Sequence, residues 1–386
     1  MGEIIQLTEK DFPEIFALSK FAFQYEIPPE DMQKRIEETK RHKIWGWMEQ
    51  GVLAGKLHLH SFSCYLDGEK FAMGGIGGVA TWPEHRRKGI IKRLLYHALL
   101  DMKRNGQTLS FLHPFSFPFY RKYGWELVFT NKHYSIPMER LKKDWNGSGY
   151  VRRIEKDIPF LQSLYTPYAL RYNGMLARDE KWWQQRVLTG NDHIAVAYDE
   201  KGKAEGYLIY HVKNDVFTVE EFVHLSLNAW HVLMQFIANH DSMAEKVEMV
   251  ASENDHLPLW IDEPRFPQEI KPYFMARIVD VQAFLDAYPF RESQGSVPVY
   301  LHVDDDFLPD NAGNYRIEGG QVVRKDDEIP AENGIFCTIQ QLTVMLLGAK
   351  RPMELYTAGL ISGSSVAVKQ LEEIVPVQQT YLTDFF

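Results

Sequence analysis

Residues 71–106 restrict the possible folds most, because glycine-rich, basic and amphipathic patterns follow one another there. Four of the five residues from 74 to 78 are glycines, and Pro83 comes soon after them. Glycine weakens a strand unless it forms a bulge or lets a ligand or another backbone come close. Apolar residues over 90–102 then recur at helical spacing, which predicts a helix with one buried stripe that Gly106 ends. The segment therefore predicts a strand, a basic turn and a helix.

The basic turn has the composition of an anion site. Arg86, Arg87 and Lys88 precede Gly89, directly before the predicted helix. A helix N-terminus presents unpaired N–H groups and the positive end of the helix dipole, so this turn can hold a pyrophosphate. A surface turn that is basic only for solubility is the alternative. A P-loop is excluded, since G-x-x-x-x-G-K-[ST] is absent, and a dinucleotide fold is disfavoured, since the turn lacks G-x-G-x-x-G.

The overall charge and the cysteines narrow the class of partner. The chain has 386 residues and a formal net charge of −9. Such an acidic balance is unfavourable for binding nucleic acid and favours cationic small molecules. No apolar run approaches the ~20 residues that span a bilayer, and residues 1–6 lack the pattern of a secretion signal, so no membrane partner is expected. The two cysteines, Cys64 and Cys337, suit a reduced cytoplasmic location.

Two turn-rich stretches divide the chain. One is the polar run 144–149, and the other is the loop 257–272, which carries four prolines. They predict three domains, at residues 1–147, 148–275 and 276–386. Within the second domain, apolar runs on both sides of a polar turn at 199–203 predict a hairpin.

Two motifs resemble a known enzyme family. Residues 79–91, V-A-T-W-P-E-H-R-R-K-G-I-I, resemble the acyl-CoA pyrophosphate loop of the GCN5-related N-acetyltransferases (GNAT), whose pattern is [Q/R]-x-x-G-x-[G/A]. Arg86 and Gly89 match this pattern, while Ile91 replaces its final small residue. Residues 119–125, F-Y-R-K-Y-G-W, resemble the second signature, F-Y-x-K-x-G-F. The whole chain is similar to one branch, the Eis (enhanced intracellular survival) family, which also ends in phenylalanine.

The resemblance implies a fold and an activity. The fold would be α/β (α+β), with two GNAT-like mixed-sheet domains followed by a sterol-carrier-protein-like α+β domain. The protein would transfer acetyl groups from acetyl-CoA, without a metal, to an aminoglycoside- or polyamine-like amine. It would form homo-oligomers, as a hexamer in many relatives. A carrier or sensor that binds CoA or lipid without catalysis is the alternative.

The resemblance also implies which residues bind acetyl-CoA. Backbone groups at the end of the glycine-rich strand would pair with the pantetheine arm, as an added strand does. The basic turn and the start of the helix would hold the pyrophosphate, and the segment after the next strand would touch the other flank. These cofactor-binding residues are Val79, Ala80, Thr81, Arg87, Lys88, Gly89, Ile90, Ile91, Lys92, Phe115 and Ser116.

Two catalytic residues follow from the same resemblance. Tyr120 would be the general acid, giving a proton to the leaving thiolate, which requires hydrogen-bond reach because a phenol is less acidic than a thiol. The C-terminal carboxylate of Phe386 would be the general base for the substrate ammonium. A carboxylate is a weak base unless it is buried, and the terminal aromatics Phe385 and Phe386 would supply an apolar setting. The alternatives are a core tyrosine and a tail that merely packs on its own domain.

Two further clusters are interpreted as structural. His58 and His60 alternate along a strand pattern, and exposed strand histidines are favoured over a two-histidine metal site. Asp304, Asp305 and Asp306 begin like a calcium loop, but the glycine and glutamate that such a loop needs are missing. We therefore expect a solvated acidic turn there.

Overall fold

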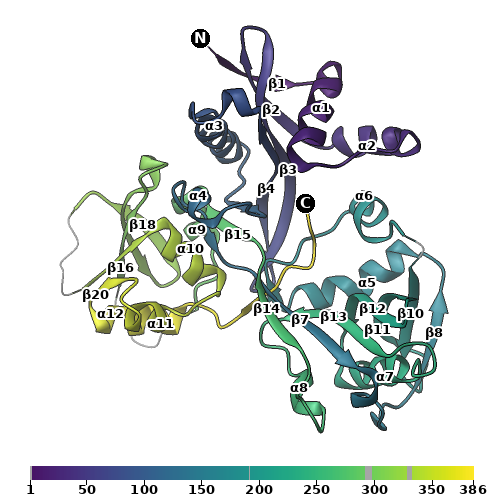
Figure 1. Ribbon diagram of the computed structural model, residues 1–386. Coiled ribbons are helices and arrows are strands. Elements are labelled where there is room, and N and C mark those ends of the chain that lie inside the picture. Colours follow the sequence, from purple (N-terminus) through teal and green to yellow (C-terminus); the bar gives the residue numbers. More distant parts are fainter. Residues whose placement is uncertain (1, 191, 292–297, 328–332) are drawn as a thin grey trace.

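The computed structural model describes residues 2–190, 192–291, 298–327 and 333–386. Within these residues, the three larger sheets form three lobes, and the tail that follows the third lobe returns to the long strands of the first (Figure 1). No helix in the described part of the chain is long and apolar enough to cross a bilayer. The mixed-sheet α/β (α+β) architecture expected from the sequence is confirmed.

The first sheet has seven strands and carries the glycine-rich segment. Its core lies between the sheet and its helices: α1 packs on the side of Leu7 and Ala80, and α3 packs on Leu57 and Leu59. The strands, in spatial order, are β1 (Glu3–Leu7), β2 (Lys43–Glu49), β3 (Val52–Leu66), β4 (Glu69–Thr81), β5 (Leu109–Leu112), β15 (Met275–Ile278) and β6 (Glu126–Leu127). The helices are α1 (Phe12–Phe23), α2 (Met32–Thr39), α3 (Ile90–Arg104) and α4 (Phe117–Arg121).

Helix α3 confirms the helix predicted after the basic turn. Its stripe is buried at Leu94, Leu95, Ala98 and Leu99, all without exposed surface. The helix ends at a glycine in the left-handed region, Gly106 (φ 69°), whose N–H donates to the carbonyl of Lys103. The sequence therefore fixes both the buried face and the end of this helix.

The second sheet also has seven strands. They are, in order, β14 (Gln268–Pro272), β7 (Thr130–Pro137), β13 (Lys246–Ser252), β12 (Val216–His224), β11 (Ala204–Lys213), β10 (His193–Tyr198) and β8 (Tyr150–Ile154). Strands β10 and β11 form the predicted hairpin. The helices of this lobe are α5 (Ile158–Ala169), α6 (Glu180–Trp182), which continues as the π-helical turn Trp183–Val187, α7 (Leu227–Ala238) and α8 (Leu257–Trp260).

The third sheet has five strands and four helices around it. The strands are β18 (Gln321–Lys325), β17 (Gly313–Glu318), β16 (Val299–Asp304), β19 (Gly334–Thr338) and β20 (Ser362–Gly363), and the helices are α9 (Val281–Ala287), α10 (Ile339–Leu347), α11 (Pro352–Thr357) and α12 (Ser365–Ile374). After α12, β21 (Gln379–Thr380) pairs in parallel with β9 (Tyr172–Asn173) of the second lobe. Short 3-10 turns are Glu9–Asp11, Pro29–Asp31, Pro83–His85, Met138–Arg140 and Pro309–Asn311.

The sheets exchange strands along the chain. Strand β7 lies before residue 148 and joins the second sheet, whereas β15, at residues 275–278, joins the first sheet. The domain boundaries at residues 147 and 275 stay a prediction. Hydrogen bonds between strands link the neighbouring lobes across both boundaries.

Candidate active site

Strands β4 and β5 separate partway along their length. They pair in parallel only from Met73 with Leu109 to Ile76 with Leu112, and β4 then continues to Thr81. Gly78 lies at φ 55°, where the register between β3 and β4 shifts. The predicted pantetheine-binding residues Val79, Ala80 and Thr81 lie on this stretch, where β4 still pairs with β3 at Ala80 and Thr81 but its other edge no longer pairs with β5. Backbone groups here are available to an added strand-like ligand.

The turn after β4 is suited to an anion. Gly89 precedes α3 with φ 74°, and Arg87 also has a left-handed backbone, at φ 61°. A β-carbon at Gly89 would have open space around it, so the backbone conformation, rather than crowding, favours glycine there. Such a turn aims N–H groups outward at the positive end of the helix dipole.

The side chains of this turn differ in how deeply they are buried. Ile90 is buried and Ile91 is half-buried, and they fix the helix against the sheet. Arg87, Lys88 and Lys92 are exposed. The exposed side chains and the helix N-terminus together fit a diphosphate.

Tyr120 lies in α4, the short helix that follows β5 after the loop 113–116. Its residue is 2% exposed, and its ring contacts those of Phe115, Phe119 and Trp125, with centroids 5.4, 5.1 and 6.4 Å away. Burial raises the pKa of Tyr120, which keeps the hydroxyl protonated. Phe115 is 71% exposed, and Ser116 is the N-cap residue of α4.

The glycine of the second signature has a structural explanation. Gly124 has φ 89°, and a β-carbon there would lie 1.5 Å from a guanidinium nitrogen of Arg277. Arg277 comes from β15 and donates to the carbonyl of Tyr123 and to Asp305, and both charged side chains are buried. The expectation of a solvated acidic turn is wrong for Asp305, because this carboxylate pairs with an arginine from outside the turn.

Phe386 lies over the glycines of β4. Its ring centroid is 4.9 Å from that of Phe62 and 4.8 Å from that of Phe274. A β-carbon at Gly75 would come within 2.7 Å of the Phe386 ring, and one at Gly77 within 3.6 Å of its carboxyl carbon. The end of the sequence thus reaches the point where β4 and β5 separate.

A buried ion pair anchors this tail. Asp384 accepts hydrogen bonds from Arg178 (3.0 Å) and from the indole N–H of Trp182 (2.7 Å). Arg178 also donates to Glu221 of β12 (3.1 Å), and the side chains of all three charged residues are nearly inaccessible. Burial raises the pKa of Asp384. The second lobe therefore holds the tail in place over the first.

The basic side chains of Lys56, His58 and His60 form a buried row on β3, which the sequence did not predict. His58 and His60 are 8% and 6% exposed, so the expectation of exposed histidines is wrong. Lys56 donates to the carbonyl of Gly78 (2.9 Å) and lies 2.9 Å from His58 Nε2, while His58 Nδ1 lies 3.0 Å from His42 Nδ1. The alternation of the sequence places these side chains on one face, but the segments that bury that face are distant in the chain.

The titration of this row follows from its burial. Burial lowers the pKa of Lys56 to about 7, and burial together with nearby cations lowers the pKa of His42 to about 3. No group of histidine, cysteine, aspartate and glutamate side chains among the described residues is arranged to hold a metal ion.

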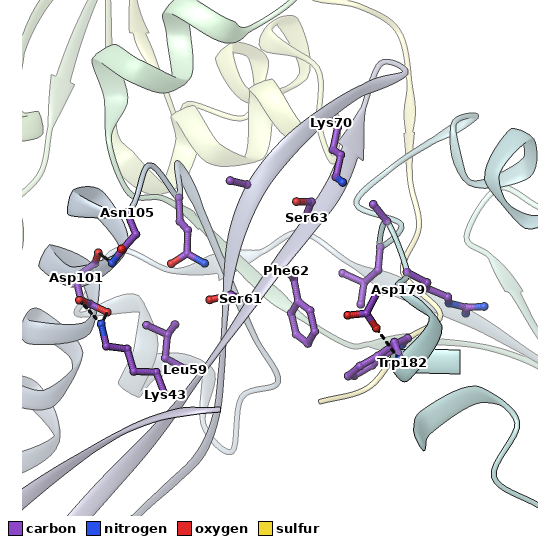
Figure 2. Close-up of a pocket in the computed structure, with 15 residues that line it drawn as sticks. Lys43, Leu59, Ser61, Phe62, Ser63, Lys70, Asp101, Asn105, Asp179 and Trp182 are labelled. Carbon is purple, nitrogen blue, oxygen red and sulfur yellow. Dashed lines mark hydrogen bonds and ion pairs between the residues drawn. The ribbon is translucent and has the colours of Figure 1, made fainter. Parts of the chain in front are cut away.

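A cavity of about 630 Å³ opens along the edge of β3 beyond Leu59, which pairs with Lys43, the first residue of β2. Figure 2 shows the ion pair of Lys43 with Asp101 (2.7 Å) on one side of it, Asp179 and Trp182 on the other, and Phe62 between them. Because Phe62 and Trp182 both contact the Phe386 ring, this cavity borders the end of the chain.

Comparisons with known families agree with this architecture. Residues 3–128 and 174–278 each match an Acetyltransferase (GNAT) domain family, and residues 281–383 match a Sterol carrier protein domain family. The structure superposes on a conserved protein of unknown function from Enterococcus faecalis V583, described as a probable N-acyltransferase, with a TM-score of 0.93, 26% identity and 100% of both chains covered. Eis1 from Mycobacterium abscessus shares the fold, with a TM-score of 0.83, 21% identity and 100% of both chains covered.

Curated sequences give the same family. An uncharacterized N-acetyltransferase from Streptomyces griseus is 24% identical over 269 residues, which cover 62% of this chain and 64% of that relative. N-acetyltransferase Eis from Mycobacterium tuberculosis is 22% identical over 407 aligned positions, which cover 97% of this chain and 98% of that protein. With two GNAT domains, a sterol carrier protein domain and a likeness to Eis over nearly the whole length, the chain belongs to the Eis branch of the GCN5-related N-acetyltransferases.

Proposed function

We propose that the protein transfers the acetyl group of acetyl-CoA directly to an amine of a small molecule. The observation that supports this most is the contact of Phe386 with Gly75 and Gly77, where β4 and β5 separate. A carboxylate at that point suits a reaction in which an ammonium must lose its proton before it attacks a thioester.

The donor acetyl-CoA binds along β4 and the turn after it in this proposal. Backbone groups of Val79, Ala80 and Thr81 pair with the pantetheine arm. The turn 87–92 holds the diphosphate, and Phe115 and Ser116 touch the other flank. The edge of β4 that β5 leaves unpaired after Ile76 and the left-handed backbone at Arg87 and Gly89 support this assignment.

The two proton transfers use two residues. The carboxylate of Phe386, as general base, takes a proton from the acceptor ammonium. The free amine then attacks the thioester carbon, the carbon–sulfur bond breaks, and the Tyr120 hydroxyl, as general acid, protonates the thiolate. Burial raises the pKa of Tyr120 and so makes the hydroxyl a weaker acid, and the proton transfer therefore depends on a direct hydrogen bond to the sulfur as its charge develops. No covalent enzyme intermediate is required.

The family resemblance and the net charge support a cationic acceptor of the aminoglycoside or polyamine kind. The family resemblance likewise supports a homo-oligomer such as a hexamer, which light scattering measures directly, and the two cysteines support a cytoplasmic location.

The test is release of CoA from acetyl-CoA in the presence of a panel of amines. We expect release that depends on the amine, and a protein extended by one glycine after Phe386 to lose it while still binding acetyl-CoA. The extension keeps every side chain and moves only the carboxylate. Binding of acetyl-CoA without release with any amine would instead support the carrier or sensor.

A further inference from the structure

The peptide between Gly78 and Val79 lies at the reacting end of the proposed site. Along β4, the carboxyl carbon of Phe386 approaches Gly77, and the pantetheine arm is assigned to residues 79–81. The thioester joins this arm to the acetyl group, so it belongs between these two points. In the strand registers of the described chain, neither β3 nor β5 pairs with Gly78 or Val79. This peptide is therefore available to the thioester.

Lys56 of β3 holds the carbonyl of this peptide. Its Nζ donates to the carbonyl oxygen of Gly78 (2.9 Å), and the residue has no exposed surface. His58 supports the same point, since its Nε2 lies 2.9 Å from Lys56 Nζ and a β-carbon at Gly78 would lie 2.8 Å from its ring. A buried donor or acceptor without a partner is costly, so this hydrogen bond fixes the direction of the carbonyl.

The direction of this carbonyl sets the direction of the next N–H group. The peptide bonds of the described chain are all trans, and in a trans peptide the C=O and the N–H point in opposite directions. The carbonyl of Gly78 points to Lys56 on β3. The N–H of Val79 therefore points away from Lys56, toward the edge of β4 that β5 leaves unpaired after Ile76.

We propose that Lys56 is a positioning residue, which aims the N–H of Val79 at the carbonyl oxygen of the acetyl thioester. When the acceptor amine attacks the thioester carbon, that oxygen gains negative charge, and an N–H group already directed at it stabilises the transition state without reorganisation. The electron pair returns to the carbonyl as the carbon–sulfur bond breaks. Lys56 acts only through Gly78. The inference rests on the proposed acetyl transfer and assigns a further residue to it.

The bulge in β4 explains why a lysine is needed there. The register shifts at this point and leaves Gly78 without a pairing residue on β3, so the amine of Lys56 supplies the donor that a paired strand would supply. A buried lysine is costly to the fold, which favours a role in the reaction over a purely structural one. The carbonyl of Val79 and the backbone of Ala80 and Thr81 remain for the pantetheine arm.

Variants at position 56 test the role in turnover. Lys56→Met keeps the length of the side chain and removes the donor, so kcat should fall by about tenfold to 10²-fold, less than the loss of a whole oxyanion donor because the N–H remains. The dissociation constant for acetyl-CoA and the free energy of unfolding should not worsen. Lys56→Arg keeps a donor and should restore part of kcat. Lys213→Met, the same change at an exposed lysine of β11, is the matched control.

Infrared spectroscopy reads the contact without turnover. Acetyl-CoA labelled with ¹³C at the thioester carbonyl is bound to each protein in the absence of an acceptor. A hydrogen bond to a carbonyl lowers its stretching frequency. We therefore expect the labelled band at a lower frequency in the parent protein and in Lys213→Met than in Lys56→Met, with Lys56→Arg between them.

The two measurements separate this inference from the proposed reaction. A band that shifts in Lys56→Met, without CoA release from the parent protein with any amine, would leave the positioning standing and overturn the acetyl transfer. Release with an unchanged kcat in Lys56→Met would overturn the positioning and leave the transfer standing. A fall in kcat with an unchanged band, in step with a loss of unfolding free energy, would also overturn it, because the lysine would then serve the fold alone.

Discussion

At the scale of single residues, Tyr120 is the group on which the proposed proton delivery depends. A phenylalanine keeps the ring contacts with Phe119 and Trp125 and removes only the hydroxyl. We expect Tyr120→Phe to lower kcat by about 10²–10⁴-fold, the usual contribution of a general acid, with an unchanged dissociation constant for acetyl-CoA. Tyr96→Phe, the same change at a tyrosine that is 42% exposed, is the control. A kcat within twofold of the parent protein would show that another group delivers the proton.

Gly124 gives a second residue-level prediction. A methyl group there overlaps the guanidinium of Arg277, so Gly124→Ala should break the buried pair with Asp305. We expect a loss of about 3–5 kcal/mol in the free energy of unfolding, measured by urea denaturation. Gly68→Ala is the control, since Gly68 has nearly the same φ (83°) and open space around it. Its loss should be only the backbone strain, about 1–2 kcal/mol. Equal losses would mean that the φ angle alone requires glycine at 124.

At the scale of elements, β3 carries a buried lysine whose charge opposes folding. Between about pH 7 and pH 10 the unfolded chain binds a proton at Lys56 that the folded protein does not, because burial lowers the pKa of Lys56 to about 7. The free energy of unfolding should therefore increase with pH, by about 2 kcal/mol from pH 7 to pH 9. Urea denaturation at both pH values measures this increase.

Lys56→Met isolates the contribution of the lysine to that pH dependence. The variant should lose this increase and should be more stable than the parent protein at pH 7, because a methionine buries no charge. If the parent and the variant show the same change between pH 7 and pH 9, the amine of Lys56 does not titrate in this range.

At the scale of the whole molecule, the second lobe fixes the tail that crosses the first. Asp384→Asn weakens the pair with Arg178, and we expect a lower kcat because the Phe386 carboxylate is no longer held over Gly77. Glu221→Gln removes the other acid partner of Arg178 without touching the tail. Both variants should lose about 3–5 kcal/mol of stability, but kcat should fall further in Asp384→Asn. Thermal denaturation and CoA release measure the two effects, and equal losses of kcat would argue against positioning by the tail.

Local sequence patterns determined the strand, turn and helix around Gly89, because helical and strand periodicities, prolines and left-handed glycines act within a few residues. They also placed His58 and His60 on one face of a strand. Only the tertiary structure decided that this face is buried, that Asp305 pairs with Arg277, and that Asp384 pairs with Arg178. Each of these contacts joins segments far apart in the chain, and burial and ion pairing depend on which surfaces the packing of the lobes brings together.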